Sequence, residues 1–227
     1  MSDTAIASAH QHAIEEIIHR WFAFFEGTTV SAKKQCELFT EDGQIVHAGQ
    51  YLLANGQQEI ERWLDSVPVE ISSHTIDGLT IESLAANQFQ AHWQTAYQSL
   101  RGAEQVGGAL ISYQALIDTD TSGAAKFRFI QKTPIANNPN LVFQESFSVH
   151  RLKALLCRLA KLIESFDISG FDQLKVVKEN KDLLLKLLQT PNTHIAMHHD
   201  SLSLTTPTKA YPLEIIEQPG TFPFLKL

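Results

Sequence analysis

Apolar residues near the start of the chain recur at the three- and four-residue spacing of a helix. Between Ala9 and Glu26 the charged side chains fall mostly on the opposite side of that helix, and Gly27 follows directly. The pattern predicts a long amphipathic helix that ends at this glycine. Its apolar face consists of Ile14, Ile17, Ile18, Trp21, Phe22 and Phe25.

Shorter elements are predicted after the long helix. Val30–Phe39 and Gly56–Leu64 have the spacing of two further helices, and Pro68 prevents the second from continuing. A short strand is predicted between them over Gln44–Ala48, and an extended segment begins with Ile71–His74.

Further along, apolar residues recur at every second position instead of every third or fourth. Along residues 88–98 apolar side chains alternate with glutamines and a histidine, so one face packs while the other meets water or a partner. Two more strands are predicted over Val106–Ile117 and Lys126–Ile135, with a turn between them. Helices followed by long antiparallel strands predict an α+β fold, in which a curved sheet surrounds the first helix.

The character of the chain changes after Ala136–Asn140, which has the composition of a linker. Beyond it, apolar residues follow a helical stripe over 149–166, and a second helical run extends over 169–188. We therefore predict two domains, 1–138 and 139–227, the second of them mostly helical.

A weak internal repeat links the two predicted domains. The first copy would run from Asn55 to Pro68 and continue with Ile71–His74. A similar pattern runs from Asn180 to Pro191 and continues with Ile195–His198. The second domain is thus either a truncated copy of the first or similar to it by chance.

Charge and cysteine content narrow the functional classes. Residues 1–148 hold 8 Lys and Arg against 17 Asp and Glu, residues 149–190 hold 8 against 5, and the whole chain has a net charge of -7. This balance opposes binding to nucleic acid or anionic lipid. Cys36 and Cys157 lie among apolar residues, as reduced core cysteines do. We expect a cytoplasmic protein that binds neither nucleic acid nor membranes.

The order of predicted elements between Ala13 and Ile81, with the junctions Leu38–Gly43 and Ile71–His74, resembles the nuclear transport factor 2-like superfamily and its SnoaL-like branch. The resemblance extends over roughly the first 135 residues. It implies a cone-shaped, cystatin-like sheet around the first helix, an apolar pocket inside the cone, and a sheet face through which relatives dimerise. A homodimer, or a pseudo-dimer within one chain, is therefore expected through that face.

The same resemblance suggests catalytic candidates. His47 stands where steroid isomerase-like members carry a carboxylate base, and His74 stands where many SnoaL-like members carry a histidine that faces the pocket. A histidine suits general acid or base work because its unperturbed pKa is about 6.5. Tyr97 is a candidate hydrogen-bond donor. The competing interpretation is that the histidine is buried and only forms a hydrogen bond to a neighbouring strand or hydroxyl group, and that the tyrosine only packs.

Aromatic residues supply the candidate pocket wall. The expected ligand-binding residues are Trp21, Phe25, Trp63, Trp93 and Tyr113. For Trp21, which aligns with an oxyanion-binding tyrosine of the isomerases, a role as a core aromatic is favoured. No cofactor or metal site is predicted, because only His194, His198 and Asp200 share one side of a strand and no second element anchors them.

Three functions remain open. The first is a lyase, isomerase or cyclase that transfers protons in the pocket, with His47 and His74 converging on the substrate. The second is a non-catalytic module that binds a small apolar metabolite in the same pocket. The third is a protein-interaction module whose pocket is filled by its own side chains.

Overall fold

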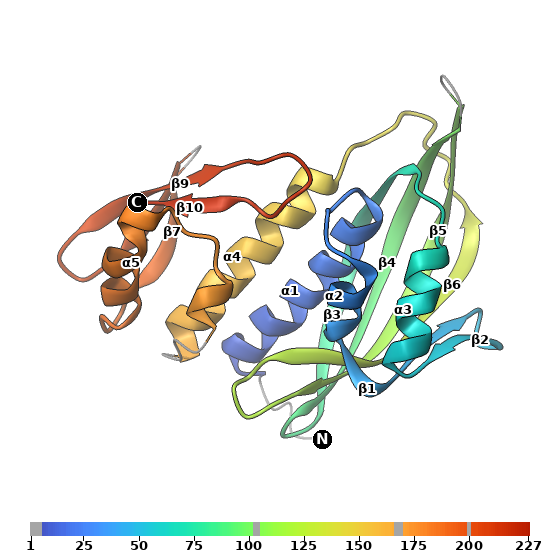
Figure 1. The fold of residues 1–227 in the computed structure, drawn as a ribbon, viewed down its shortest axis with the longest axis horizontal. Helices are drawn as coiled ribbons and strands as arrows, with labels where there is room; N and C mark the ends of the chain where they lie inside the picture. Colours follow the sequence, from blue (N-terminus) through green and yellow to red (C-terminus); the bar gives the residue numbers. More distant parts are fainter. Residues whose placement is uncertain (1–5, 102–104, 166–169, 199–200) are drawn as a thin grey trace.

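The computed structural model describes residues 6–101, 105–165, 170–198 and 201–227. It confirms the predicted α+β class, with helices and a curved sheet first, then two further helices and a second sheet (Figure 1). The helices are α1 (Ser8–Phe25), α2 (Ala32–Gln35), α3 (Gln57–Ser66), α4 (Phe147–Ser165) and α5 (Lys181–Leu188), and the turn η1 (Cys36–Leu38) follows α2.

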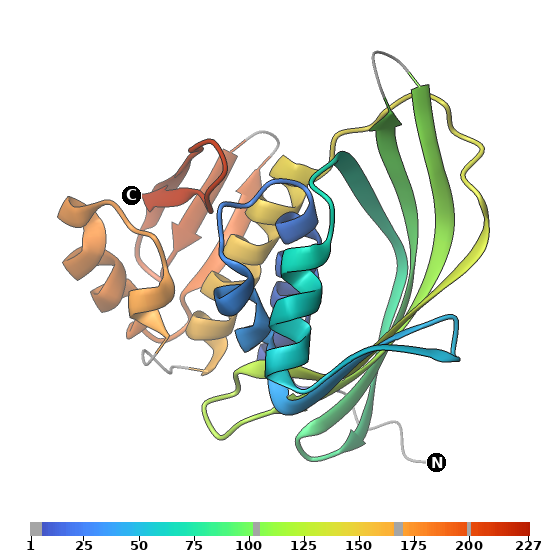
Figure 2. The same ribbon diagram turned by 45° about the vertical axis from the view of Figure 1, so that its right-hand side comes forward.

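The first sheet contains six strands in the order β2-β1-β6-β5-β4-β3. Neighbouring strands are antiparallel except β1 and β6, which run parallel. The strands are β1 (Phe39–His47), β2 (Tyr51–Asn55), β3 (Ile71–Ala85), β4 (Gln88–Arg101), β5 (Gln105–Thr119) and β6 (Ala125–Asn137). The long strands bend around the side of the sheet that faces α1 and α3 (Figure 2).

The amphipathic pattern of α1 explains how this helix is held. Ile14, Ile18 and Phe22 are completely buried, as their helical spacing predicted, and they pack in one core with apolar residues of the sheet such as Trp93 and Phe127. Burying side chains of this size stabilises the fold by about 1.5–3 kcal/mol each. Gly27, with a φ of 116°, ends the helix where the pattern placed its end.

The C-terminal residues form a second core around another sheet. Leu159, Leu184, Leu204 and Leu225 are buried in it. The sheet is antiparallel, in the order β10-β9-β8-β7, and was not predicted beyond a strand near residue 195. Its strands are β7 (His194–His198), β8 (Ser201–Thr205), β9 (Ala210–Ile216) and β10 (Phe224–Lys226).

The prediction of one helical run over 169–188 was wrong. The turns η2 (Phe171–Gln173) and η3 (Lys178–Asn180) precede α5, with an extended stretch between them. In that stretch Val176 forms a parallel bridge to Leu225, and the Val177 N–H donates to the Leu225 carbonyl at 2.9 Å. Pairing with a distant strand has therefore replaced the local helical hydrogen bonds.

Helix α4 packs antiparallel to α1, and the two helices lie between the two sheets (Figure 2). Glu16 of α1 is buried between Arg20, at 3.4 Å, and Arg158 of α4, with which it forms a second ion pair. The C-terminal part thus contacts the first helix. Dimerisation through the sheet face, and a domain boundary at residue 138, stay predictions.

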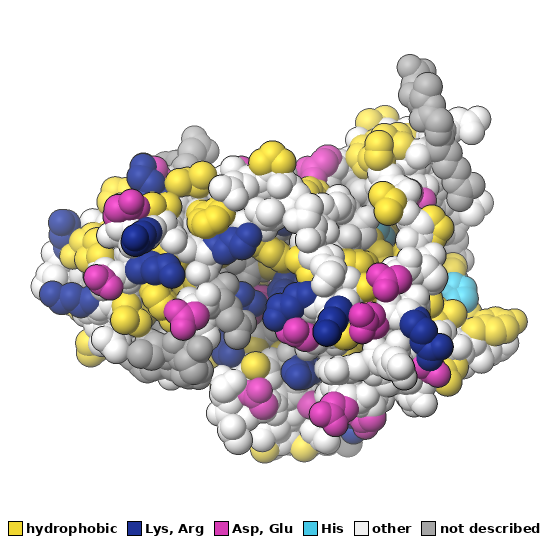
Figure 3. Space-filling model, viewed as in Figure 1, with side chains coloured by type: hydrophobic (Ala, Val, Ile, Leu, Met, Phe, Trp, Pro, Cys, Tyr) yellow, Lys and Arg dark blue, Asp and Glu magenta, His cyan; other side chains and the backbone are white. Residues whose placement is uncertain are grey.

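On the face seen in Figure 3, basic and acidic side chains are mixed over the C-terminal part and over the helices α2 and α3. None of the helices that the structure describes combines the length and apolar character required to span a membrane. The cytoplasmic location stays a prediction.

Candidate active site

A cavity of about 670 Å³ lies between α1, α3 and the long strands. Its wall contains several aromatic side chains: Trp21 and Phe25 stand one helical turn apart on α1, and Trp63 of α3 stacks on Trp21 with 6.1 Å between ring centroids. The cavity is therefore not closed by its own side chains. The polar side chains in its lining include Glu70, His74, Tyr97 and Lys132.

His74, on β3, is held by a buried carboxylate. Its Nδ1 lies 2.9 Å from Oε1 of Glu26, the residue directly after α1, and the two side chains are 9% and 0% exposed. The ring of Phe22 stacks on the imidazole at 5.0 Å. Because Nδ1 faces the carboxylate, Nε2 is the nitrogen that a molecule in the cavity would meet. The sequence predicted His74 and missed Glu26, which lies on the charged side of the helical pattern.

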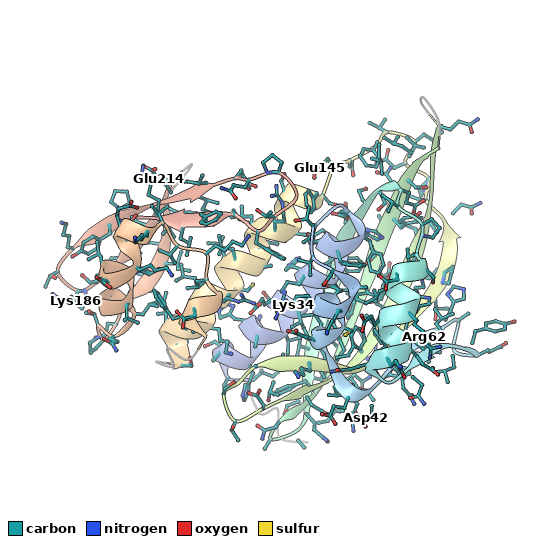
Figure 4. The ribbon with its side chains drawn as sticks, in the orientation of Figure 1. Lys34, Asp42, Arg62, Glu145, Lys186 and Glu214 are labelled. Atoms are coloured by element: carbon teal, nitrogen blue, oxygen red, sulfur yellow. The ribbon has the colours of Figure 1, made fainter. Side chains whose placement is uncertain are left out.

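Helix α4 completes the surroundings of this pair. The Ser146 hydroxyl donates to Glu26 Oε1 at 2.7 Å and accepts the His74 backbone N–H at 2.9 Å. His150 donates from Nε2 to the His74 carbonyl oxygen at 2.7 Å. In Figure 4, the labelled Glu145 marks the start of α4, beside the end of α1. Ser146 and His150 are far from His74 in sequence and carried no signal that could have found them.

Behind the pair, two histidines meet inside the protein. His19 Nδ1 and His150 Nδ1 are 2.9 Å apart, and both side chains are buried. Since a neutral His150 that donates from Nε2 has a lone pair on Nδ1, the hydrogen-bond network assigns the shared proton to His19. Glu26, His74, Ser146, His150 and His19 thus form one continuous chain of polar contacts, which we call the buried network.

Burial sets the protonation of the buried network. Loss of water, together with the nearby Lys132, lowers the pKa of His74 to about 3, although Glu70 acts in the opposite direction. Burial likewise raises the pKa of Glu26 to about 7, although His150 and the Ser146 hydrogen bond act in the opposite direction. Glu26 Oε2 is buried without a hydrogen-bond partner, which agrees with a destabilised carboxylate. His74 is therefore neutral at pH 7 but weakly basic, so it accepts a proton only where a neighbouring negative charge such as that of Glu26 stabilises the imidazolium.

The other polar groups of the cavity can interact with an electron-rich ligand. Burial lowers the pKa of Lys132, and its Nζ lies 5.4 Å from the centre of the Trp63 ring. Within the described residues, no carboxylate forms an ion pair with this ammonium group. Tyr97 donates to Glu70, and burial raises the pKa of Tyr113, which keeps its phenol protonated.

The remaining predicted residues lie elsewhere. His47 is at the end of β1, opposite Tyr51, and does not line the cavity, so the structure does not bring His47 and His74 together. Trp93 is 2% exposed and stacks on Tyr113 within the core, with 5.1 Å between ring centroids. Asp200 and the side chain of His198 lie outside the described residues.

No family model matches the sequence, and no curated protein sequence matches it either. Solved structures do resemble part of the chain. A nuclear transport factor 2-like protein with a cystatin-like fold from Novosphingobium aromaticivorans is 14% identical, with a TM-score of 0.48 over 55% of this chain and 81% of that one. A hexachlorocyclohexane dehydrochlorinase from Novosphingobium barchaimii is 12% identical, with a TM-score of 0.48 over 60% of this chain and 92% of that one.

The strand order and the helices described above agree with the fold that the sequence resemblance implied. Residues 6–101 and 105–137 place three helical segments before four long strands, and these strands curve around α1. The fold carries no information about the reaction, which depends on the side chains in the cavity. By this topology, the N-terminal part of the chain has an α+β fold in which a curved sheet surrounds the first helix.

Proposed function

We propose that the protein is an enzyme that removes a proton from carbon in a small, largely apolar molecule, as the first step of lyase or isomerase chemistry. The observation that carries this proposal is the contact between His74 and the buried Glu26 at the wall of an aromatic cavity. A purely structural histidine would not need to border a cavity of about 670 Å³.

In this mechanism Nε2 of neutral His74 accepts the proton, while Nδ1–H stays hydrogen-bonded to Glu26. The carboxylate holds the ring in one tautomer and stabilises the imidazolium that forms. Ser146 fixes the carboxylate and the backbone of His74 relative to one another through its two hydrogen bonds. The base is therefore positioned before the substrate enters.

Lys132 indicates what the substrate carries besides an acidic C–H bond. A cation at the wall of the cavity stabilises negative charge that develops on a carbonyl oxygen or on a leaving group. The electrostatic attraction between this cation and the developing negative charge is larger here than in water, because the effective dielectric constant inside a protein is lower. We therefore infer a substrate with an electron-withdrawing group, oriented so that this group faces Lys132 and its C–H faces His74.

A nitrobenzisoxazole tests the proposal without knowledge of the natural substrate. The ring C–H proton passes to the base, the C–H electron pair completes a nitrile, and the N–O bond breaks to release a coloured nitrophenolate. We expect saturable turnover that falls by about 100-fold or more in His74→Ala, since general base catalysis contributes roughly 10²–10⁴-fold. His47→Ala, a histidine outside the cavity lining, is the matched control and should keep the rate.

Two results would contradict this proposal. One is turnover no faster than that of free imidazole, and the other is equal rates for His74→Ala and the unmodified protein. Quenching of Trp21 or Trp63 fluorescence by apolar compounds, with no turnover of any of them, would instead favour the non-catalytic binding module.

The rate should also depend on the protonation of Glu26. Because the pKa of this carboxyl is about 7 and only its ionised form stabilises the imidazolium, we expect the rate to rise with pH through about 7. In Glu26→Gln the rate should be lower and the rise near pH 7 should disappear. A rise that persists in this variant would show that another group controls the base.

A further inference from the structure

A second group of chemically active side chains lies farther along the contact between α1 and α4. His12 and Glu15 are three residues apart on α1, so they share one face of the helix, and Cys157 of α4 lies opposite them. One ligand atom of each residue lies within 4.8 Å of the others. The Cys157 thiol is 3.6 Å from Oε2 of Glu15, to which it donates.

His12 is already oriented by a carboxylate. Its Nε2 lies 3.4 Å from Oε1 of Glu164, while its Nδ1 is buried and has no hydrogen-bond partner. A histidine that binds a metal commonly donates its other ring N–H to a carboxylate, which fixes the ring and raises its basicity. The unpartnered Nδ1 is the nitrogen that such a metal would use.

We propose that His12, Glu15 and Cys157 bind a zinc ion between α1 and α4. Imidazole, carboxylate and thiolate are ligands that Zn²⁺ accepts in tetrahedral geometry, whereas Mg²⁺ and Ca²⁺ require oxygen ligands. The fourth position faces a cavity of about 370 Å³ that these residues line together with His194 of β7. This site is separate from the buried network and does not depend on the proposed function.

A zinc ion bound here would take Cys157 as its thiolate, because the metal supplies the positive charge that favours this form. Since the ligands come from both helices, the ion would also hold the C-terminal part against the first helix.

Titration of metal-free protein with Co²⁺ tests the site directly. Tetrahedral Co²⁺ gives visible absorption, and a Co²⁺–thiolate bond adds a near-ultraviolet band. We expect both to saturate at one Co²⁺ per chain and to disappear when Zn²⁺ is added. Cys157→Ser should lose the thiolate band, while Cys36→Ser, which changes the other free cysteine, should keep it.

A second pair of variants covers the case in which Cys157→Ser does not fold. His12→Ala should weaken Zn²⁺ binding by at least about tenfold, since loss of even an outer-shell partner of a metal ligand costs about 10–100-fold in affinity. His10→Ala removes a histidine of the same helix that packs against Phe89 and should leave binding unchanged. A Co²⁺ complex without tetrahedral absorption, a thiolate band that persists in Cys157→Ser, or equal affinities of His12→Ala and His10→Ala would overturn the proposal.

Discussion

Lowering the pH from 7 to 4 is expected to destabilise the protein by several kcal/mol, because histidines of the buried network are neutral in the folded state. The pKa values of His19 and His74 are about 3 in the folded protein, against 6.5 for a free side chain. At pH 4 each of these histidines would lower the free energy of unfolding by on the order of 3 kcal/mol, since one pKa unit corresponds to about 1.4 kcal/mol. The pKa of His150 is lowered by burial too and acts in the same direction.

Stability falls at low pH because the unfolded state then binds more protons than the folded state. Below pH 6.5 the unfolded chain protonates these histidines and the folded protein does not, so their contribution is complete above pH 6.5 and is lost as the pH falls towards 3. Glu26 acts in the opposite direction, because its raised pKa of about 7 lets the folded state take up a proton first. The stability gained from Glu26 at low pH is about as large as the stability lost from one histidine. It therefore does not offset the combined loss from all the buried histidines.

Urea unfolding between pH 7 and pH 4 measures this effect. The free energy of unfolding should decrease steadily below pH 6.5, and less steeply in His19→Gln, which removes one titrating group. Val149→Ala, an exposed and uncharged position on α4, should follow the unmodified protein. A free energy that stays constant down to pH 4 would mean that the buried histidines are not held neutral.

Replacing Phe22 by alanine is expected to cost about 3–5 kcal/mol of stability, as for other fully buried phenylalanines. The side chain is 0% exposed, and its ring contacts His74, Trp93, Tyr113 and His150 at centroid distances between 5.0 and 6.4 Å. It separates the buried network from the aromatic core, so its loss would leave a void beside the base. The change should therefore also reduce any turnover that depends on His74.

Phe25→Ala is the matched control, since this phenylalanine is three residues further along α1 and already borders the cavity. Part of its surface has no protein neighbour to lose, so we expect a smaller loss of stability and weaker binding of aromatic ligands. Thermal and urea unfolding of both variants measure the difference. Equal losses, or a loss below about 1 kcal/mol for Phe22→Ala, would contradict the packing described for this ring.

The buried network changes the role of the C-terminal part. Ser146 and His150 contact Glu26 or His74 directly, so the candidate base is completed by residues beyond the first sheet. Without α4 and the Ser146 that precedes it, the first sheet and its helices would leave the carboxylate of Glu26 with fewer hydrogen bonds. The two predicted domains therefore share one site, although the sequence suggested that the pocket belonged to the first alone.

The sequence by itself determined the class of fold and much of the cavity wall. Helical spacing from Ile14 to Phe25 predicted α1 and its buried face, and alternation along residues 88–98 predicted β4. Because each pattern reports which side of one element is buried, it also indicated Trp21 and Phe25 as inward-facing residues, whereas His74 was suggested by the family resemblance. The spacing of apolar residues was sufficient to predict the buried face of a helix or strand where that face is set within the element itself.

Only the tertiary structure decided which of these elements meet. The partner of His74 is Glu26 rather than His47, and Ser146, His150 and the His12–Glu15–Cys157 group all depend on the packing of α4 against α1. The extended stretch at Val176 likewise depends on pairing with a strand near the end of the chain. Contacts between residues so far apart in sequence leave no periodic trace, because their geometry is fixed by packing between elements and not by spacing within one.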